Sequence, residues 1–278
     1  MNKIILFLIF FLTLLNQVAL SQIERPNKAY GLFSANITVI ENEKYLYEYN
    51  IQNADSSEQV LNSFRLSIAD PSYYIDNKDI SGPETKKWYI DALSEGYISG
   101  SAASRFVDFP PENGLAPGES MEISFPSRGL PIVISYYTQG FVRNITMAEF
   151  DSLKEAGYTD NEIFLDWRDE SYQGTTVAPK VWPDALIPEE FLDTLITYKE
   201  QSCDLGWIEN QGICQSLEAN LNNVKRQLEQ GRTQTAANNL QAFLNEVEAI
   251  KDRQLSSEAY ALLRFNGEYL LNRLKEQD

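Results

Sequence analysis

Residues 45–51 read Tyr-Leu-Tyr-Glu-Tyr-Asn-Ile, and this segment indicates how the first half of the chain folds. Large side chains occupy every second position, which is the period of a β-strand with one buried face. One face of this strand carries Tyr45, Tyr47, Tyr49 and Ile51, and the other carries Leu46, Glu48 and Asn50. A strand with two such faces needs further strands beside it and a second layer to cover its aromatic face.

Further strands follow at short intervals. Residues 64–68 and 121–125 alternate in the same way, and residues 132–137 are apolar on both faces, which predicts a central strand. Turn residues separate these segments at Asn53 to Ser57, Asp70-Pro71, Ser81-Gly82-Pro83, Pro110-Pro111 and Ala116-Pro117-Gly118. Short strands with turns between them predict an antiparallel β-sandwich, which we place at residues 22–182.

The second half of the chain has a helical period instead. Apolar residues at 217, 221, 224 and 228 recur every three or four positions, and residues 240–250 and 259–274 repeat this pattern. Gly231 fits the end of the first helix, and Ser256 or Ser257 fits the start of the third. We expect a linker and docking helix at residues 183–202, then a small helical bundle at 203–278. The predicted fold class is therefore β followed by α.

The helical half resembles a known family. The segment from Cys203 to Leu274 is similar to the FIMAH module. The similarity lies in Gly206-Trp207-Ile208, in the run from Ala236 to Val247 and in the run from Ser257 to Leu263. FIMAH modules are appended to secreted bacterial hydrolases, lyases and surface proteins. The resemblance implies an accessory, interaction-mediating role and provides no catalytic residues. The turn Leu115 to Ser120 resembles that of bacterial extracellular Ig-like modules, and its Pro-Gly pair fits a type II turn.

The N-terminus and the cysteines predict an exported protein. Residues 1–21 have the pattern of a signal peptide, with Lys3, the apolar run 4–15 and the small residues of Ala19-Leu20-Ser21. This pattern favours a secreted, periplasmic or cell-surface location over a retained membrane anchor. We expect no membrane span in the mature chain. In an oxidising compartment the two cysteines, Cys203 and Cys214, are expected to form a disulfide, although a reactive thiol or a redox pair is an alternative.

Composition excludes several classes of function. The chain has 278 residues, with 23 basic and 40 acidic residues, a net charge of −17 and no histidine. Nucleic-acid binding is not expected, because it needs a cationic surface. Without histidine, a Ser-His-Asp triad and histidine-bound zinc are impossible. Chemistry by carboxylates, Tyr, Lys or Arg remains, as do cations held by oxygen ligands, and no cofactor is expected.

Two kinds of binding residue stand out near the turns. Aromatic residues Tyr73, Tyr74, Trp88 and Tyr89 are candidates for stacking on a sugar, although aromatic residues more often build sandwich cores. Asp76, Asp79 and Glu84 in one loop, and the acids between 160 and 169 in another, are candidates for calcium ligands. A solvated acidic face is the simpler interpretation, because neither loop has the spacing of a known calcium motif.

These observations favour a secreted, non-catalytic binding or surface-interaction module whose partner is an extracellular protein or a glycan. One alternative is a secreted polysaccharide hydrolase or lyase that uses carboxylates or Tyr. Another alternative is a structural subunit of an envelope assembly. An aligned pair of acids in a deep cleft would distinguish the enzyme from the binder.

Overall fold

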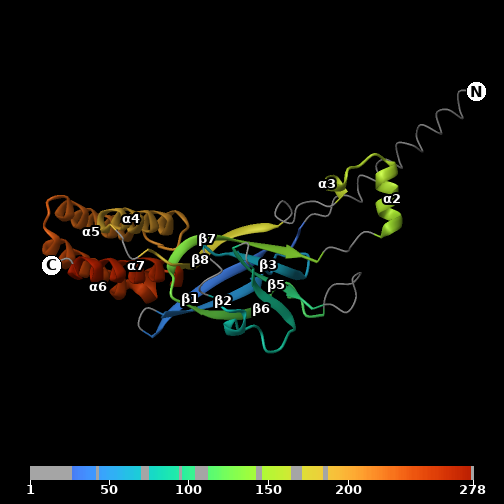
Figure 1. The fold of residues 1–278 in the computed structure, drawn as a ribbon, viewed down its shortest axis with the longest axis horizontal. Coiled ribbons are helices and arrows are strands. Elements are labelled where there is room, and N and C mark those ends of the chain that lie inside the picture. Colours follow the sequence, from blue (N-terminus) through green and yellow to red (C-terminus); the bar gives the residue numbers. More distant parts are fainter. Residues whose placement is uncertain are drawn as a thin grey trace, which may run out of the picture.

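The computed structural model describes residues 27–41, 44–69, 75–93, 96–103, 112–141, 146–163, 171–183 and 187–276. Two antiparallel sheets form the N-terminal part, and four helices follow them at the C-terminal end (Figure 1). The predicted order of β then α is confirmed. The predicted signal peptide at residues 1–21 lies outside the described residues.

The smaller sheet has three strands in the order β1-β2-β6. Strand β1 spans Gly31–Glu41, β2 spans Lys44–Asn53 and β6 spans Ser120–Ser127. Residues 45–51 lie in β2, which pairs with a strand on each side. The predicted type II turn comes just before β6: Gly118 has a φ of +84°, and the Glu119 N–H donates to the Ala116 carbonyl.

The larger sheet has five strands in the order β4-β5-β3-β7-β8. Their bounds are Trp88–Leu93 (β4), Tyr97–Ala102 (β5), Leu61–Ser67 (β3), Leu130–Gly140 (β7) and Tyr172–Lys180 (β8). Strand β7 lies between β3 and β8, as the apolar run in it predicts. The short helices are η1 (Asn77–Asp79), α2 (Met147–Glu155) and α3 (Asp160–Ile163).

Aromatic residues fill the space between the two sheets. Tyr47, Tyr49, Phe64 and Phe125 are all fully buried there, as expected for a sandwich core. The Tyr47 hydroxyl donates to the Gly129 carbonyl, at 2.8 Å, and the Tyr49 hydroxyl donates to the Val177 carbonyl, at 2.9 Å. The first bond reaches the turn between β6 and β7, and the second reaches β8 of the larger sheet. Burial raises the pKa of both tyrosines well above its ordinary value.

The C-terminal helices are amphipathic and pack as a bundle. They span Pro188–Asp204 (α4), Gln211–Glu229 (α5), Thr233–Gln254 (α6) and Ser257–Glu276 (α7). Cys203 and Cys214 form a disulfide that joins α4 to α5, as predicted. Ser256 caps α7, since its hydroxyl accepts from the Ala259 N–H.

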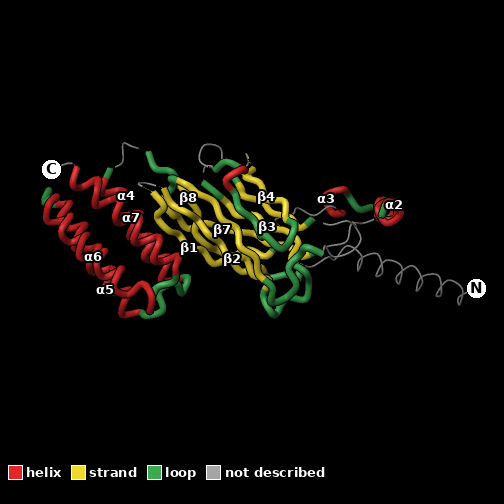
Figure 2. Tube along the Cα trace, turned by 90° about the horizontal axis from the view of Figure 1, so that it is seen from below, coloured by secondary structure: helices red, strands yellow, loops and turns green. Residues whose placement is uncertain are grey.

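Helix α7 connects the bundle to the sandwich. It packs against β1 and β7, and Figure 2 shows it on the side of the bundle that faces the strands. Two buried polar side chains of α7 bond to strand backbone: Glu258 accepts from the Ala35 N–H, at 2.7 Å, and Asn266 donates to the Pro131 carbonyl, at 2.9 Å. The two parts therefore share a specific, partly polar interface.

Candidate functional site

A polar cleft lies on the outer face of the three-stranded sheet, with a volume of about 690 Å³. Strands β1, β2 and β6 form its floor, because the side chains that alternate with the core residues point to this face. Residues 81–86 form one wall, and Ser257 at the start of α7 contributes from the bundle. The cleft is thus lined by both parts of the chain.

Strand register arranges the floor as a grid. One row across the sheet is Asn36, Glu48 and Ser124, and the next row is Ser34, Asn50 and Glu122. Directly opposite side chains in such a pair have Cβ atoms about 4.5–5.5 Å apart. The grid therefore places hydroxyl, amide and carboxylate groups side by side on a flat surface.

Much of the hydrogen-bonding capacity of this grid is available to a ligand. Asn36 Nδ2 donates to Glu48 Oε2, at 3.0 Å, which orders one row. Within the described part of the chain, the side chains of Asn50 and Glu122 make no hydrogen bond or ion pair, and both are exposed. An exposed carboxylate and an exposed amide on adjacent strands can together accept and donate several hydrogen bonds.

The charge of the cleft is negative. Three lining residues are acidic, namely Glu48, Glu84 and Glu122, and one is basic, Lys86. The ammonium of Lys86 is engaged elsewhere, because it donates to the Glu119 carboxylate, at 2.5 Å, and to the Gly114 carbonyl, at 2.8 Å. The floor and wall therefore present acidic and neutral polar groups to a ligand.

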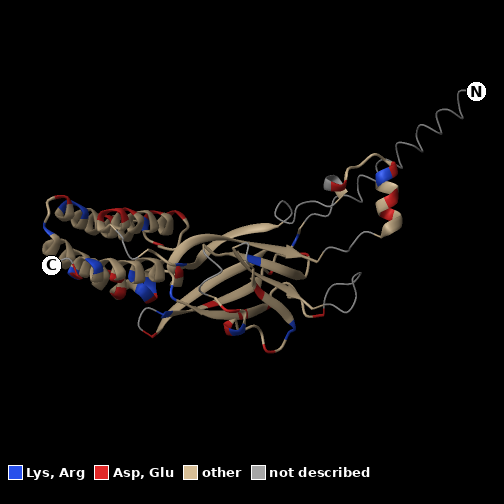
Figure 3. Ribbon diagram, in the orientation of Figure 1, with Lys and Arg blue, Asp and Glu red and all other residues tan. Residues whose placement is uncertain are grey.

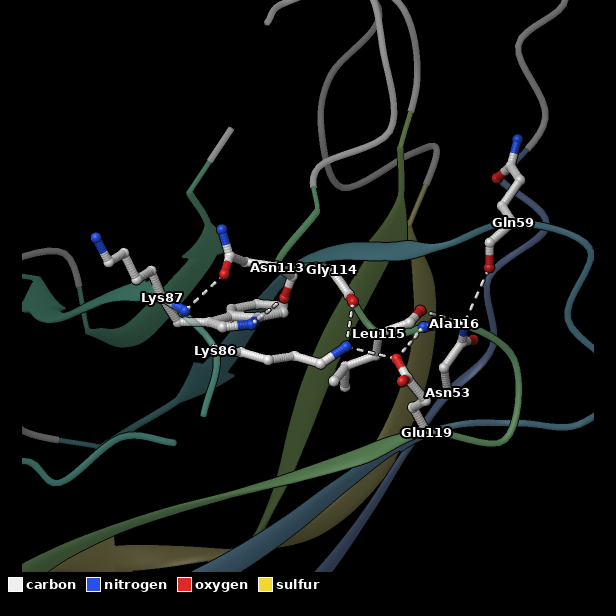
Figure 4. Close-up of polar contacts among 10 residues, drawn as sticks. Asn53, Gln59, Lys86, Lys87, Asn113, Gly114, Leu115, Ala116 and Glu119 are labelled. Atoms are coloured by element: carbon white, nitrogen blue, oxygen red, sulfur yellow. Dashed lines mark hydrogen bonds and ion pairs between the residues drawn. The ribbon is translucent and has the colours of Figure 1, made fainter. Parts of the chain in front are cut away.

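A hydrogen-bond network holds the wall against the turn before β6 (Figure 4). Besides the bonds of Lys86, the Lys87 N–H donates to Asn113 Oδ1, at 3.0 Å. Asn53 Nδ2 supports the same turn by donating to the Leu115 carbonyl, at 2.9 Å. Ser81 pairs with Ser124 as an isolated bridge at the edge of β6. The wall is therefore preorganised, which lowers the entropic cost of binding.

Glu119 is the electrostatic centre of this network. Its carboxylate accepts from Lys86 Nζ and, at 2.8 Å, from the Ala116 N–H. These two hydrogen bonds lower the pKa of Glu119 from its ordinary value of 4.5. Ionised Glu119 therefore stabilises both the wall and the turn above that pH.

Of the predicted stacking residues, the two that the structure describes, Trp88 and Tyr89, do not line this cleft. Trp88 is half-buried in β4, where its Nε1 donates to the Asn113 carbonyl, at 2.8 Å. Tyr89 is the next residue of β4 and its side chain is 70% exposed. Tyr73 and Tyr74 lie outside the described residues, so the sugar-stacking hypothesis stays a prediction.

The structure describes all three predicted calcium ligands of the first loop. Asp76 caps η1 and pairs with Lys78, at 2.7 Å, while Glu84 lies in the cleft wall. Asp79 belongs to η1 itself. Among the residues that the structure describes, no three acidic or cysteine side chains are grouped so that they could hold a metal ion.

The second acidic loop is described only in part. Asp160 begins α3 and pairs with Lys154, at 2.9 Å. Asp166 and Asp169 lie outside the described residues, and the side chain of Glu162 is not described. Calcium binding by this loop therefore stays a prediction.

The cleft residues Asn36, Glu48, Asn50 and Glu122 are functional candidates that the sequence analysis missed. The alternation in β2 correctly places Glu48 and Asn50 on the face opposite the core. Their neighbours come from strands 12 or more residues away, so only the strand order brings them together. Figure 3 shows the scarcity of charge on the strands compared with the helices, which makes the few acids of the floor distinctive.

Comparison with known proteins identifies the helical part. A model of the FIMAH domain matches residues 192–272, which extend from α4 to α7. The resemblance in the sequence is confirmed, and the match begins within α4, in the segment 183–202 that we expected to hold a linker and docking helix. FIMAH is a non-catalytic type of domain. A search of curated proteins finds no match.

No helix in the described part of the chain is long and apolar enough to cross a membrane. The disulfide between Cys203 and Cys214 is consistent with an extracellular protein, because disulfides persist in oxidising compartments.

Proposed function

We propose that this chain is a secreted, non-catalytic binding module that takes its ligand in the cleft of the three-stranded sheet. The observation that carries the proposal is the floor of that cleft, where Asn50 and Glu122 expose unpaired polar groups beside Asn36 and Glu48. Ordered strands hold these groups in place, as expected for a preformed site.

Two observations favour binding over catalysis. The chain has no histidine, which is the most common general base at neutral pH. The helical part matches the FIMAH domain, a non-catalytic type of domain, and this resemblance implies an accessory role. An accessory role needs a recognition surface, and the cleft provides one.

A secreted polysaccharide hydrolase is the second candidate, and one specific observation favours it. Glu48 and Glu122 are diagonal neighbours on adjacent strands of the floor. Diagonal neighbours are about 7–8 Å apart, which is within the range of roughly 5–9.5 Å between the two carboxyl groups of glycosidases. Against this, Glu122 is exposed, whereas a general acid usually needs a desolvated site to remain protonated.

One experiment separates the two candidates. The secreted protein, expected to begin at Gln22, is incubated with a panel of plant, fungal and bacterial polysaccharides, and both binding and reducing ends are measured. We expect retention on at least one polysaccharide without release of reducing ends. Turnover that is abolished by Glu48→Gln or Glu122→Gln would replace the binding function with the hydrolase. Finding intact Met1 in a cytoplasmic fraction would contradict secretion.

A further inference from the structure

We infer that the ligand of the cleft is an uncharged oligosaccharide, recognised by the hydroxyl, amide and carboxylate groups of the sheet face. This inference rests on the proposed function and adds the chemical class of the ligand. It concerns the outer face of β1, β2 and β6 and the wall beside it, and it needs neither Tyr89 nor a bound calcium ion.

The side chains of the floor fit the chemistry of a sugar. A carboxylate accepts hydrogen bonds from two hydroxyl groups, and an amide both donates to and accepts from them. Glu48, Asn50 and Glu122 provide these groups on neighbouring strands, with Ser34 and Ser124 beside them. A chain of sugar rings presents many hydroxyl groups along one direction, so a flat polar grid can bond to several of them at once.

Charge excludes the anionic sugars. Glu48, Glu84 and Glu122 all line the cleft, and Lys86 is held by Glu119 and Gly114. The whole chain also has a net charge of −17, so uronate or sulfate groups would be repelled. The ligand is therefore uncharged or cationic.

A peptide fits the cleft less well than a sugar does. Strand addition needs a free backbone edge on the binding surface, but β2, in the middle of the floor, already pairs with β1 and β6. Specific peptide grooves also have apolar pockets for side chains, whereas Met121 and Ile123 of β6 are buried on the core side of the sheet. The polar floor thus favours a ligand rich in hydroxyl groups.

The test uses the full mature chain from a host that does not glycosylate, because Asn36-Ile37-Thr38 is a glycosylation sequon on the floor itself. Hexasaccharides of glucose, xylose and mannose are the uncharged probes. Hexagalacturonate, a chitosan hexamer and a lysine-rich peptide are the charged ones. Affinity is measured by titration calorimetry for the wild type and for variants Asn50→Ala and Glu122→Gln.

Two controls report on other surfaces. Thr38→Ala changes an exposed residue of β1 that does not line the cleft, and Tyr89→Ala removes the exposed aromatic residue of β4. Thermal unfolding verifies that every variant is folded. We expect at least one uncharged hexasaccharide to bind, Asn50→Ala and Glu122→Gln each to weaken binding about tenfold, and both controls to bind normally.

The other outcomes overturn the inference in recognisable ways. Binding of the chitosan hexamer or the lysine-rich peptide alone would refute the uncharged ligand but keep the cleft as a binding site. Sugar binding that is lost in Tyr89→Ala and kept in Asn50→Ala would move the site to β4. A lack of binding to all uncharged probes would refute the ligand class, whereas turnover of a probe would refute the proposed function itself.

Discussion

Replacement of Glu258 by alanine tests the junction between the bundle and the sandwich. The Glu258 side chain is buried in α7, with the residue 5% exposed, and its Oε1 accepts from the Ala35 N–H of β1 at 2.7 Å. Alanine would leave that buried N–H without a partner. Because an orphaned buried donor costs about 1–3 kcal/mol and the packing of the side chain is also lost, we expect Glu258→Ala to lower the free energy of unfolding by about 2–3 kcal/mol.

Glu258→Gln is the matched variant, because its amide oxygen can still accept from the Ala35 N–H. We expect a loss of less than about 1 kcal/mol for Glu258→Gln. Glu268→Ala on the same helix removes only a partly exposed pair with Arg264 and should cost about 0–1 kcal/mol. Urea unfolding measures all three variants, and hydrogen exchange of the Ala35 amide measures the bond directly.

The junction also reaches the functional site. Ser257 lines the cleft, and Ala35 lies between the floor residues Ser34 and Asn36. Faster exchange of the Ala35 amide in Glu258→Ala should therefore extend to its neighbours in β1. Surface substitutions usually change the free energy of unfolding by up to about 0.5 kcal/mol. If Glu258→Ala changes it by no more than this, the view that Glu258 stabilises the contact between α7 and β1 is refuted.

Three further predictions concern stability. Replacing both cysteines by serine should lower the free energy of unfolding by about 3 kcal/mol, because the disulfide restricts the unfolded chain. Thiol titration of the denatured, unreduced wild type should detect no free thiol. The pKa of Glu119 is lower in the folded protein than its unfolded value of 4.5, so ionised Glu119 stabilises the fold above pH 4.5. This stabilisation is lost as the pH falls through the folded pKa. Thermal scans from neutral to acidic pH should show the loss, and the loss should be smaller in Glu119→Gln. Gly118→Ala should lower the free energy of unfolding by about 1–3 kcal/mol, because Gly118 has a φ of +84° and a Cβ there would lie 2.7 Å from Asp55 Oδ1. Urea unfolding measures this change, and an unchanged midpoint would contradict the expected strain.

Much of the fold is local enough to be predicted from the sequence. The alternation in residues 45–51 identifies β2, and the apolar run 132–137 identifies β7. Strand β1 was missed, although Phe33, Ala35 and Ile37 alternate with exposed residues. Strand β4 was also missed, and so was β5, in which Gly100 and two serines weaken the pattern.

The candidate site was not predictable in the same way. The sequence analysis selected aromatic and acidic residues near turns, and of those that the structure describes only Glu84 lines the cleft. The floor depends on the pairing of β2 with both β1 and β6, and β6 is about 70 residues further along the chain, so its register is set by tertiary packing. The contribution of Ser257 depends in turn on how α7 docks on β1.

The most direct test of the central claim is an NMR titration that monitors the side-chain amides of Asn36 and Asn50 together with the backbone amide of Ser257. The titrant is the uncharged hexasaccharide that binds most tightly in calorimetry. We predict saturable shifts at all three positions, because the floor of the cleft and its side at the start of α7 contact the ligand. Saturable shifts confined to β4 or to the outer faces of α5 and α6, with these three signals unchanged, would contradict the claim that this chain binds its ligand on the three-stranded sheet.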